Sequence, residues 1–420
     1  MFMARYFTLI RWHLFCVVWL IFGCACGGNL REKTEVTRST ERPTRPITGP
    51  TETSGTETGQ TKTSPRDQLI DTPKAREFMS LATSVDQLLG AEIKKLEGRP
   101  GFPVAGLENC GNTCYMNALL QALLHSDLGR YTEVPFDQIH FAQGVDKTKS
   151  LFRHFYDLAD AYRKAASGTA ASPRTIVDYL PELSAELKPG QQEDASEFLL
   201  KFFQRLSEEL NLLKSNKLLT YNPTDEERAN FLFNYYWIKA GEHGEYSIID
   251  GLFDGIDKTR QMKTDGSVNI QYQKFNSIQL ALDQTNETLT LEQLLANRAK
   301  EEIETSDPKT RSRQITIHQA PKTLILQLSR FTAAGKKITT KVQYPAKLSL
   351  TTAFDGPITF ELFAVILHAG TLSGGHYTAN VKSGNGKWFN ANDSVVTAID
   401  EAEALRDQAG AYVLFYRRAP

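Results

Sequence analysis

Cys114 lies at the end of a polar, glycine-containing loop and at the start of a stretch with helical periodicity. Apolar residues recur behind it at helical spacing: Met116, Leu119, Leu120, Leu123 and Leu124. We therefore expect a helix with one buried face, its first turn capped by Asn112 or Thr113. A cysteine at a helix start meets the positive end of the helix dipole and free backbone amides, which favour the thiolate. The pattern predicts a nucleophile at Cys114, with the Asn109 amide as a donor to an oxyanion.

The residues that could assist such a nucleophile lie far along the chain. His376 follows two glycines, between an apolar strand and a second predicted strand. Imidazole takes and returns a proton near neutral pH, so His376 suits the role of base. His368 competes for that role, but its position at the end of the preceding strand favours a structural one. Asn392 and Asp393 are candidates for the third group, which fixes the tautomer of a base histidine.

Each of these residues also has an ordinary structural explanation. A lone cysteine in an apolar helix is usually part of the core, and an isolated histidine is usually a core or surface residue. An Asn-Asp pair between two strands is typical of a polar turn. The loop before Cys114 and the Gly-Gly-His stretch, taken together, favour catalysis.

Three stretches resemble one known family. Residues 106–121, GLENCGNTCYMNALLQ, resemble the cysteine box of the ubiquitin-specific proteases, a papain-like family of deubiquitinating enzymes. Residues 189–210, PGQQEDASEFLLKFFQRLSEEL, are similar to the family's glutamine-aspartate box. GGHYTA at 374–379 and KWFNANDSVV at 387–396 are similar to its histidine region. The resemblance spans about 102–418, which is the whole predicted catalytic domain.

The resemblance implies a role for each candidate residue. Cys114 would attack the carbonyl after the terminal Gly-Gly of ubiquitin, in peptide or isopeptide bonds. His376 would activate the thiol and protonate the leaving lysine amine. Asn392 would orient His376, with Asp393 as a supporting group, and Asn109 would stabilise the oxyanion. The implied partners are ubiquitin and ubiquitinated proteins.

The glutamine-aspartate box has a helical pattern of its own. Its apolar positions form one stripe: Ala195, Phe198, Leu199, Phe202, Phe203 and Leu206. Asp194 and Glu197 are three residues apart and share the other face, where an ordinary solvated surface is the alternative explanation. In the family this box lines the cleft for the basic, extended ubiquitin tail, so the resemblance implies that Gln192, Asp194 and Glu197 bind substrate.

The expected fold class is α+β. The resemblance implies a papain-like architecture with a helical thumb, a β-rich palm and fingers between them. We expect strands within 247–282 and 320–350, with visible alternation from Thr323 to Phe331. We expect a helix over 289–300 and an exposed, charged tip over 301–313.

The finger region departs from the family pattern. Fingers of family members commonly carry two Cys-x-x-Cys pairs that bind zinc, but neither 261–267 nor 304–310 contains a cysteine. A four-thiolate zinc site is therefore excluded, and we expect no metal and no cofactor. The fingers would survive as a metal-free hairpin or be shortened.

Composition narrows the partners further. The 420 residues are 41% hydrophobic and 23% charged, as is typical of a folded enzyme. A net charge of −1 gives no strong basic field, so we expect no nucleic-acid partner. The five cysteines form no disulfide framework, since three lie in the first thirty residues. We expect a monomer.

Residues 1–28 have the pattern of a targeting segment. Arg5 and Arg11 precede an apolar run over 14–22, followed by small residues that include Cys24. The run is short for a membrane span of about 20 residues, and it suits a signal peptide or a bacterial lipoprotein signal with an acylated Cys24. A membrane anchor stays open. This start favours a membrane-anchored or secreted protein, and suggests a bacterial enzyme acting in a host cell.

The remaining chain divides by composition. Residues 29–73 are rich in Thr, Pro and Gly and poor in apolar residues, so we expect a disordered linker. Residues 74–101 are a helical lead-in, and 102–418 form the catalytic domain. Two other functions stay open: a protease for a different ubiquitin-like modifier, and a non-catalytic ubiquitin-binding module.

Overall fold

A computed structural model describes residues 73–99, 101–165, 169–212, 246–303, 308–371 and 374–419. The helices are α2 (Pro73–Lys94), α3 (Cys114–Leu124), α4 (Asp127–Tyr131), η2 (Phe136–Gln138), α5 (Leu151–Lys164), α6 (Arg174–Leu183), α7 (Ala195–Glu209), α10 (Ile248–Phe253), α11 (Leu291–Arg298) and α12 (Glu401–Ala404). The predictions for 1–28 and 29–72 lie outside the described residues.

The strands divide between thumb, fingers and palm. They are β1 (Gly106–Leu107), β2 (Ala170–Ala171), β3 (Gly255–Lys263), β4 (Val268–Phe275), β5 (Ile278–Ala281), β6 (Thr288–Thr290), β7 (Glu302–Ile303), β8 (Thr310–Gln319), β9 (Thr323–Ser329), β10 (Lys341–Gln343), β11 (Lys347–Thr352), β12 (Gly356–Thr371), β13 (Gly374–Lys382), β14 (Trp388–Asn392), β15 (Val395–Ile399) and β16 (Ala411–Arg418). The predicted α+β class is confirmed.

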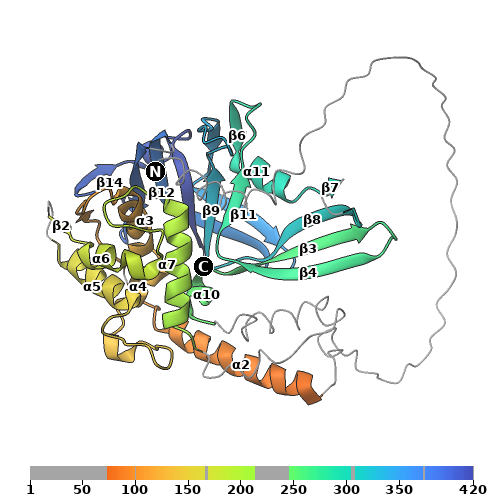
Figure 1. Ribbon diagram of the computed structural model, residues 1–420, viewed down its shortest axis with the longest axis horizontal. Coiled ribbons are helices and arrows are strands. Elements are labelled where there is room, and N and C mark those ends of the chain that lie inside the picture. Colours follow the sequence, from red (N-terminus) through yellow and green to blue (C-terminus); the bar gives the residue numbers. More distant parts are fainter. Residues whose placement is uncertain are drawn as a thin grey trace, which may run out of the picture. The chain divides into compact units, whose positions relative to one another are not determined.

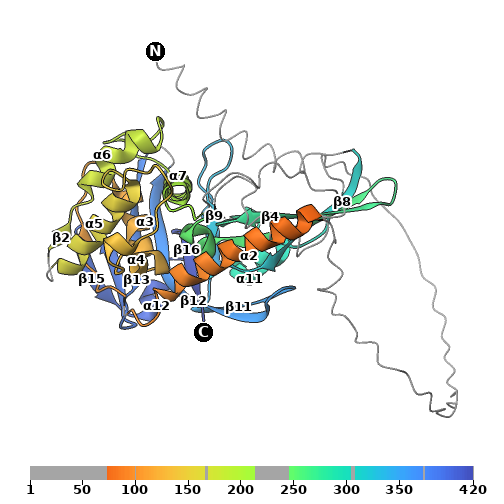
Figure 2. The same ribbon diagram turned by 90° about the horizontal axis from the view of Figure 1, so that it is seen from below.

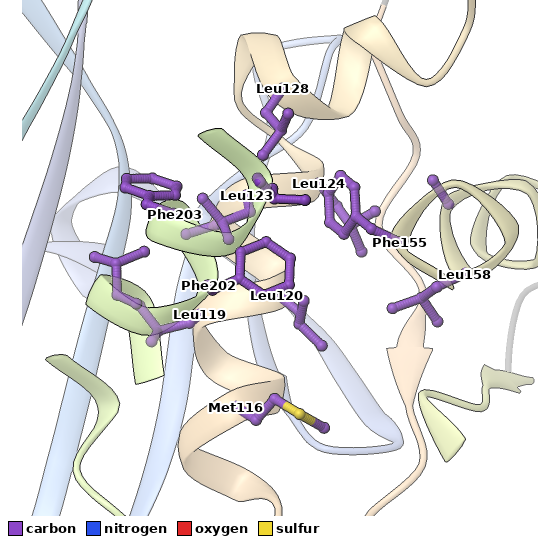
Figure 3. Packing of buried hydrophobic residues seen from close by; sticks show 14 of the residues in the cluster. Met116, Leu119, Leu120, Leu123, Leu124, Leu128, Phe155, Leu158, Phe202 and Phe203 are labelled. Carbon is purple, nitrogen blue, oxygen red and sulfur yellow. The ribbon is translucent and has the colours of Figure 1, made fainter. Parts of the chain in front are cut away.

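The thumb is a group of helices around α3 (Figure 1). All eleven residues of α3 are buried, so the prediction of a single buried face is wrong. The helix packs on β12, β13 and β14 on one side and against α4 and α7 on another. Figure 3 shows leucines of α3 meeting aromatic side chains of α5 and α7. A helix enclosed in this way needs apolar residues around its whole circumference.

Helix α7 follows the pattern predicted for it. The six positions of its apolar stripe are all buried. Its N-cap is Asp194, whose carboxylate accepts the backbone N–H groups of Ser196 and Glu197. An acidic cap satisfies free amides and complements the helix dipole, which explains why the helix begins at Ala195.

The palm is a mixed sheet in the order β15-β14-β13-β12-β16-β9-β5, with β11 paired to β12. Six of the seven residues of β9 are buried in succession, so the expected alternation over this strand is wrong. The strand lies inside the sheet, and hydrophobic clusters pack on both of its faces. A strand covered on both faces has a continuous apolar run instead of alternation.

The fingers are a four-stranded sheet in the order β4-β3-β8-β7, which extends away from the thumb (Figure 1). Strands β3 and β4 form the hairpin that the sequence predicts for the fingers, while part of the predicted tip is strand β8. At the hairpin end the Lys263 ammonium donates to the Thr310 hydroxyl at 2.8 Å. Thr264 N–H donates to the Lys309 carbonyl at 3.1 Å. These hydrogen bonds join the ends of β3 and β8.

A short helix, α10, begins where the sequence analysis expected strand. Ser247 and Asp250 form a capping box in which each side chain accepts the backbone N–H of the other residue. The Ser-x-x-Asp spacing was visible in the sequence and is a helix start signal. The prediction of strands within 247–282 is confirmed by β3, β4 and β5, but the start of that range is helical, and β3 begins at Gly255.

Helix α2 covers the stretch for which periodicity predicts a helix, and Figure 2 shows it as one long rod. Leu89 of α2 belongs to the thumb core and contacts α10, where a Cβ on Gly251 would lie 2.5 Å from a Leu89 methyl carbon. Among the described residues no helix is long and apolar enough to cross a membrane.

Candidate active site

The loop before Cys114 is held by its own polar side chains. Asn109 Oδ1 accepts the Gly111 N–H at 3.0 Å, and Thr113 Oγ1 accepts the Cys110 N–H at 3.0 Å. Thr113 occupies the N-cap position of α3, but neither its side chain nor that of Asn112 caps the helix. The predicted capping is therefore wrong, because the Thr113 hydroxyl turns back into the loop.

The Cys114 thiol is almost fully enclosed, with 4% of the residue exposed. Burial raises the pKa of Cys114, and the nearby Asp393 charge raises it further. Backbone N–H groups of Tyr377, Tyr115 and Cys114 itself lower that pKa but do not outweigh burial. Burial of the helix start therefore opposes the thiolate that the dipole and the free amides would favour. A nearby base that takes the thiol proton would offset this effect.

His376 and Asn392 are brought together by neighbouring strands. His376 Nε2 lies 2.7 Å from Asn392 Oδ1. An amide oxygen only accepts, so the Nε2 of His376 carries the proton and donates. The other ring nitrogen, Nδ1, is then the free base. The structure thus contains the histidine–asparagine pair that the sequence predicted.

The thiol and the imidazole are close in the fold, although no hydrogen bond joins their side chains in the described part of the chain. The backbone N–H of Tyr377, the residue after His376, lies near enough to the Cys114 sulfur to lower the pKa of the thiol. Helix α3, which begins at Cys114, packs directly on β13, the strand that contains His376 and Tyr377. Contacts of this kind are often long in a free enzyme and tighten when substrate binds.

Asp393 joins the two halves of the site. Its Oδ2 accepts from Asn109 Nδ2 at 2.8 Å, and its Oδ1 accepts from Asn117 Nδ2 at 2.7 Å. Its carbonyl accepts the Leu107 N–H at 2.9 Å. Asp393 has a φ of 50°, a left-handed conformation that Asp tolerates in turns. The residue positions the cysteine loop and α3 and makes no contact with His376 among these bonds.

Replacing Asp393 with alanine is expected to lower kcat by about 100-fold, because Asn109 and Asn117 lose their common acceptor and the loop shifts. Asp393→Asn keeps one acceptor oxygen, so its kcat is expected to fall less than that of Asp393→Ala. Steady-state kinetics on a ubiquitin–fluorophore substrate, with circular dichroism to verify folding, measures both variants. A kcat within threefold of wild type for Asp393→Ala would contradict the positioning role.

The three predicted substrate-binding residues differ in their surroundings. Gln192 exchanges two hydrogen bonds with the backbone of Gly375, next to His376. The carboxylate of Asp194 is engaged by the cap of α7 and by the Tyr412 hydroxyl. Glu197 is partly exposed on the first turn of α7. Asp194 therefore has a structural role, and substrate contact by these residues stays a prediction.

The carboxylates of Glu193 and Glu197, near Tyr115, interact with one another. Burial, then the charges of Glu197 and Glu186, raise the pKa of Glu193 to about 7. Burial, then the charges of Glu186 and Asp194, also raise the pKa of Glu197. The charges of Glu193 and Glu197 both act on Tyr115, which follows the nucleophile in the chain. A cation placed here would relieve the repulsion.

Sequence reasoning missed several residues that build the site. Asn117 holds Asp393 and also donates to the Glu108 carbonyl at 3.1 Å. Asn117 lies three residues after Cys114 and is polar within an apolar run. This position could have indicated that its side chain faces the site on the same side of the helix as Cys114. Tyr412 has no local sequence signal, because its partner Asp194 lies 218 residues away. His368 is buried, with its ring centroid 4.5 Å from that of Tyr377, consistent with a structural role.

Within the described ranges, no group of three or more His, Cys, Asp or Glu side chains could hold a metal ion. The site brings together a thiol at a helix start, a histidine oriented by an amide, and amide donors in the loop. This is the arrangement of a papain-like cysteine protease site.

The chain belongs to the ubiquitin carboxyl-terminal hydrolase family, whose model matches residues 105–416. Among human relatives, Ubiquitin carboxyl-terminal hydrolase 17-like protein 15 is 29% identical over 347 residues, which cover 80% of this chain and 58% of that protein. The 17-like protein 6 has the same identity, with 80% of its length covered. The chain thus spans less than two thirds of the first relative.

Solved structures show the same fold. The SAGA DUB module of Ubp8, Sgf11, Sus1 and Sgf73 bound to monoubiquitin has a TM-score of 0.60 at 20% identity, over 77% of this chain and 70% of that one. The same module bound to ubiquitin aldehyde has a TM-score of 0.58 at 21% identity, over 77% and 71%. The papain-like architecture of thumb, palm and fingers is therefore established.

Proposed function

We propose that this chain is a thiol-dependent deubiquitinase that hydrolyses the peptide or isopeptide bond after the C-terminal glycine of ubiquitin. The observation that carries the proposal is the site itself: Cys114 beside the strand of His376, with His376 oriented by Asn392. Family membership and the ubiquitin named in the structural relatives' titles support the choice of substrate.

The reaction follows from the positions of the groups. His376 Nδ1 takes the Cys114 proton as the sulfur attacks the glycine carbonyl, and the resulting oxyanion carries the negative charge. The Cys114 N–H and the second N–H of Asn109 Nδ2 donate to that oxyanion, while the first stays on Asp393. His376 returns the proton to the leaving lysine amine. Water, activated by His376, then cleaves the thioester and restores the thiol.

A panel of fluorogenic substrates made from ubiquitin and from other ubiquitin-like modifiers tests the proposal on the full chain. We expect hydrolysis of the ubiquitin substrate and covalent labelling of Cys114 by ubiquitin vinyl sulfone. Preferential cleavage of another modifier would show that this modifier, and not ubiquitin, is the substrate. Ubiquitin binding without labelling of Cys114 would show that the chain is a non-catalytic ubiquitin-binding module. Gel filtration at working concentration tests the proposed monomer.

Ubiquitin binding is expected to strengthen as pH rises from about 6 to 8. The ubiquitin tail is basic, and Glu193, with a pKa raised to about 7, gains its charge over this interval. Above that pKa the charged form attracts the tail, whereas below it the neutral form does not. We expect Kd to fall roughly three- to tenfold, measured by calorimetry on Cys114→Ala so that turnover does not interfere.

Two variants separate Glu193 from other titrating groups. Glu193→Gln in the Cys114→Ala background is expected to flatten the dependence of Kd on pH. Glu182→Gln removes an exposed carboxylate from the surface of α6. This control variant is expected to leave the dependence of Kd on pH unchanged. An equally steep profile in Glu193→Gln would show that another group is responsible.

We further propose that the N-terminal segment attaches the enzyme to a membrane, through an acylated Cys24 or an uncleaved apolar helix. The apolar run over 14–22 and the polar stretch over 29–73 support this proposal. A flexible linker of this length has an r.m.s. reach of about 35–40 Å, enough to hold the catalytic domain off the surface. The lipoprotein-like pattern also favours a bacterial protein acting in a host cell.

Fractionation of the full chain and of residues 74–420 tests the attachment. We expect the full chain in membranes and the truncated protein in solution, with equal activity. Cys24→Ser releases the protein if acylation anchors it, and continued membrane association would favour an uncleaved helix. A full-length protein found in solution with its first residues intact would contradict both routes.

A further inference from the structure

The side chain of Gln192 behaves like a short piece of backbone. Its Nε2 donates to the Gly375 carbonyl at 3.1 Å, and its Oε1 accepts the Gly375 N–H at 3.2 Å. A carboxamide that both donates to and accepts from one residue reproduces the pair of bonds exchanged between antiparallel strands. Gln192 thus pairs with Gly375 as a neighbouring strand would.

Gly375 and the catalytic sulfur share one edge of β13. Alternate residues of a strand point their backbone groups to the same side, so Gly375 and Tyr377 face the same way. The Tyr377 N–H meets the Cys114 sulfur, and two residues along a strand span about 7 Å. Among the described strands, β14 pairs with β13 only from Ala379 to Lys382. The stretch from Gly375 to Tyr377, here called the thumb-facing edge, is paired with no described strand on this side.

The Gly375 backbone has no room to withdraw from this edge. A Cβ at Gly375 would lie 2.2 Å from His368 Nε2, so the buried His368 packs closely behind it. The absence of a Cβ is what lets the His368 ring pack against this backbone. The thumb-facing edge is therefore backed by His368 and cannot move toward it.

The loop that carries Gln192 is fixed at both ends. Asn112 Nδ2 donates to the Gly190 carbonyl at 2.9 Å, which ties this loop to the cysteine loop. Asp194 is fixed as the cap of α7. Gln192 itself is exposed, so its side chain can rotate away while the loop stays in place.

We propose that Gln192 is a displaceable gate: its carboxamide occupies the Gly375 backbone groups that an extended substrate tail must use to reach Cys114. The proposal rests on the proposed function, which supplies a tail ending in Gly-Gly. Such a tail adds to the thumb-facing edge as a strand, and its peptide groups replace the carboxamide of Gln192.

The gate should affect substrate binding and not the chemical step. Rotation of an exposed side chain takes picoseconds to nanoseconds, far faster than turnover. Only the fraction of free enzyme in which Gln192 has rotated away from Gly375 can bind the tail. The apparent affinity for substrate is the intrinsic affinity multiplied by that fraction. Two solvent-exposed neutral hydrogen bonds correspond to a roughly three- to tenfold effect.

Kinetics of Gln192→Ala in the full chain tests the gate. We expect KM for ubiquitin–rhodamine to fall roughly three- to tenfold, with kcat within about twofold of wild type. Gln191→Ala is the matched control, since Gln191 is an exposed neighbour whose side chain makes no hydrogen bond in the described structure. A KM for Gln192→Ala that is unchanged or higher overturns the gate, because Gln192 would then hold the substrate.

Hydrogen exchange provides a measurement that needs no substrate. In the free full chain, the Gly375 amide is expected to exchange several times faster in Gln192→Ala than in wild type or Gln191→Ala. Equal exchange would show that Gln192 does not close the thumb-facing edge, and would overturn the gate. If wild type fails to cleave any ubiquitin substrate, the proposed function fails, while the exchange result still decides whether Gln192 covers Gly375.

Discussion

Cys114→Ala is expected to abolish hydrolysis of ubiquitin substrates, with kcat reduced by at least about 10⁴-fold. The sulfur is the group that forms the covalent intermediate, and removing it leaves only binding and oxyanion stabilisation. Ubiquitin affinity should stay within about threefold of wild type, because Cys114 is buried and alanine keeps the helix start. Single-turnover kinetics and calorimetry measure the two quantities.

Cys110→Ser is the matched control for this variant. Cys110 lies in the same loop, half-buried, with its sulfur 3.9 Å from the Ser172 hydroxyl, and it makes no contact with His376 among the described residues. We expect most activity to remain. Activity retained in Cys114→Ala, or lost equally in both variants, would falsify the assignment of Cys114 as nucleophile.

Arg330→Met is expected to lower the free energy of unfolding by about 3–5 kcal/mol. Arg330 is 1% exposed, and its guanidinium donates to four backbone carbonyls: Ala411 at 2.8 Å, Gln408 at 2.7 Å, Ile338 at 3.2 Å, and Thr340. Burial lowers its pKa to about 10. The Gln408 carbonyl keeps the Val342 N–H as a donor at 3.1 Å. Each carbonyl left without a donor would cost about 1–3 kcal/mol, and removing the buried charge offsets part of that cost.

Urea unfolding monitored by tryptophan fluorescence measures this change. Lys336→Met is the control, since Lys336 is an exposed cation in the same loop and should change stability by less than about 0.5 kcal/mol. The loop also supports the site, because Lys337 Nζ donates to the His368 carbonyl at 2.6 Å. Equal stabilities for the two variants would show that the Arg330 bonds are not needed.

The predictions that the structure confirms came from short sequence motifs. The stretch around Cys114 starts a helix at the expected residue, and the apolar stripe of α7 is buried. His376 and Asn392 pair across two strands as the sequence suggested. Local periodicity and motif chemistry are properties of neighbouring residues, so they can be read from the chain directly.

The failures share a different origin. Burial of all of α3 and of both faces of β9 depends on what packs around them, and similar apolar patterns occur with one or two faces covered. The missed helix α10 is a separate kind of error, because its capping box at Ser247 was present in the sequence.

The sequence by itself determined the family, the chemical identity of the site and the absence of thiolate pairs in the fingers. It carries these because residue types and short spacings encode them. Only the tertiary structure decided that Asp393 holds Asn109, 284 residues away, that burial raises the pKa of Cys114, and that Gln192 covers Gly375. Hydrogen-bond partners and pKa shifts depend on distance and desolvation in space, which folding sets by bringing remote segments together.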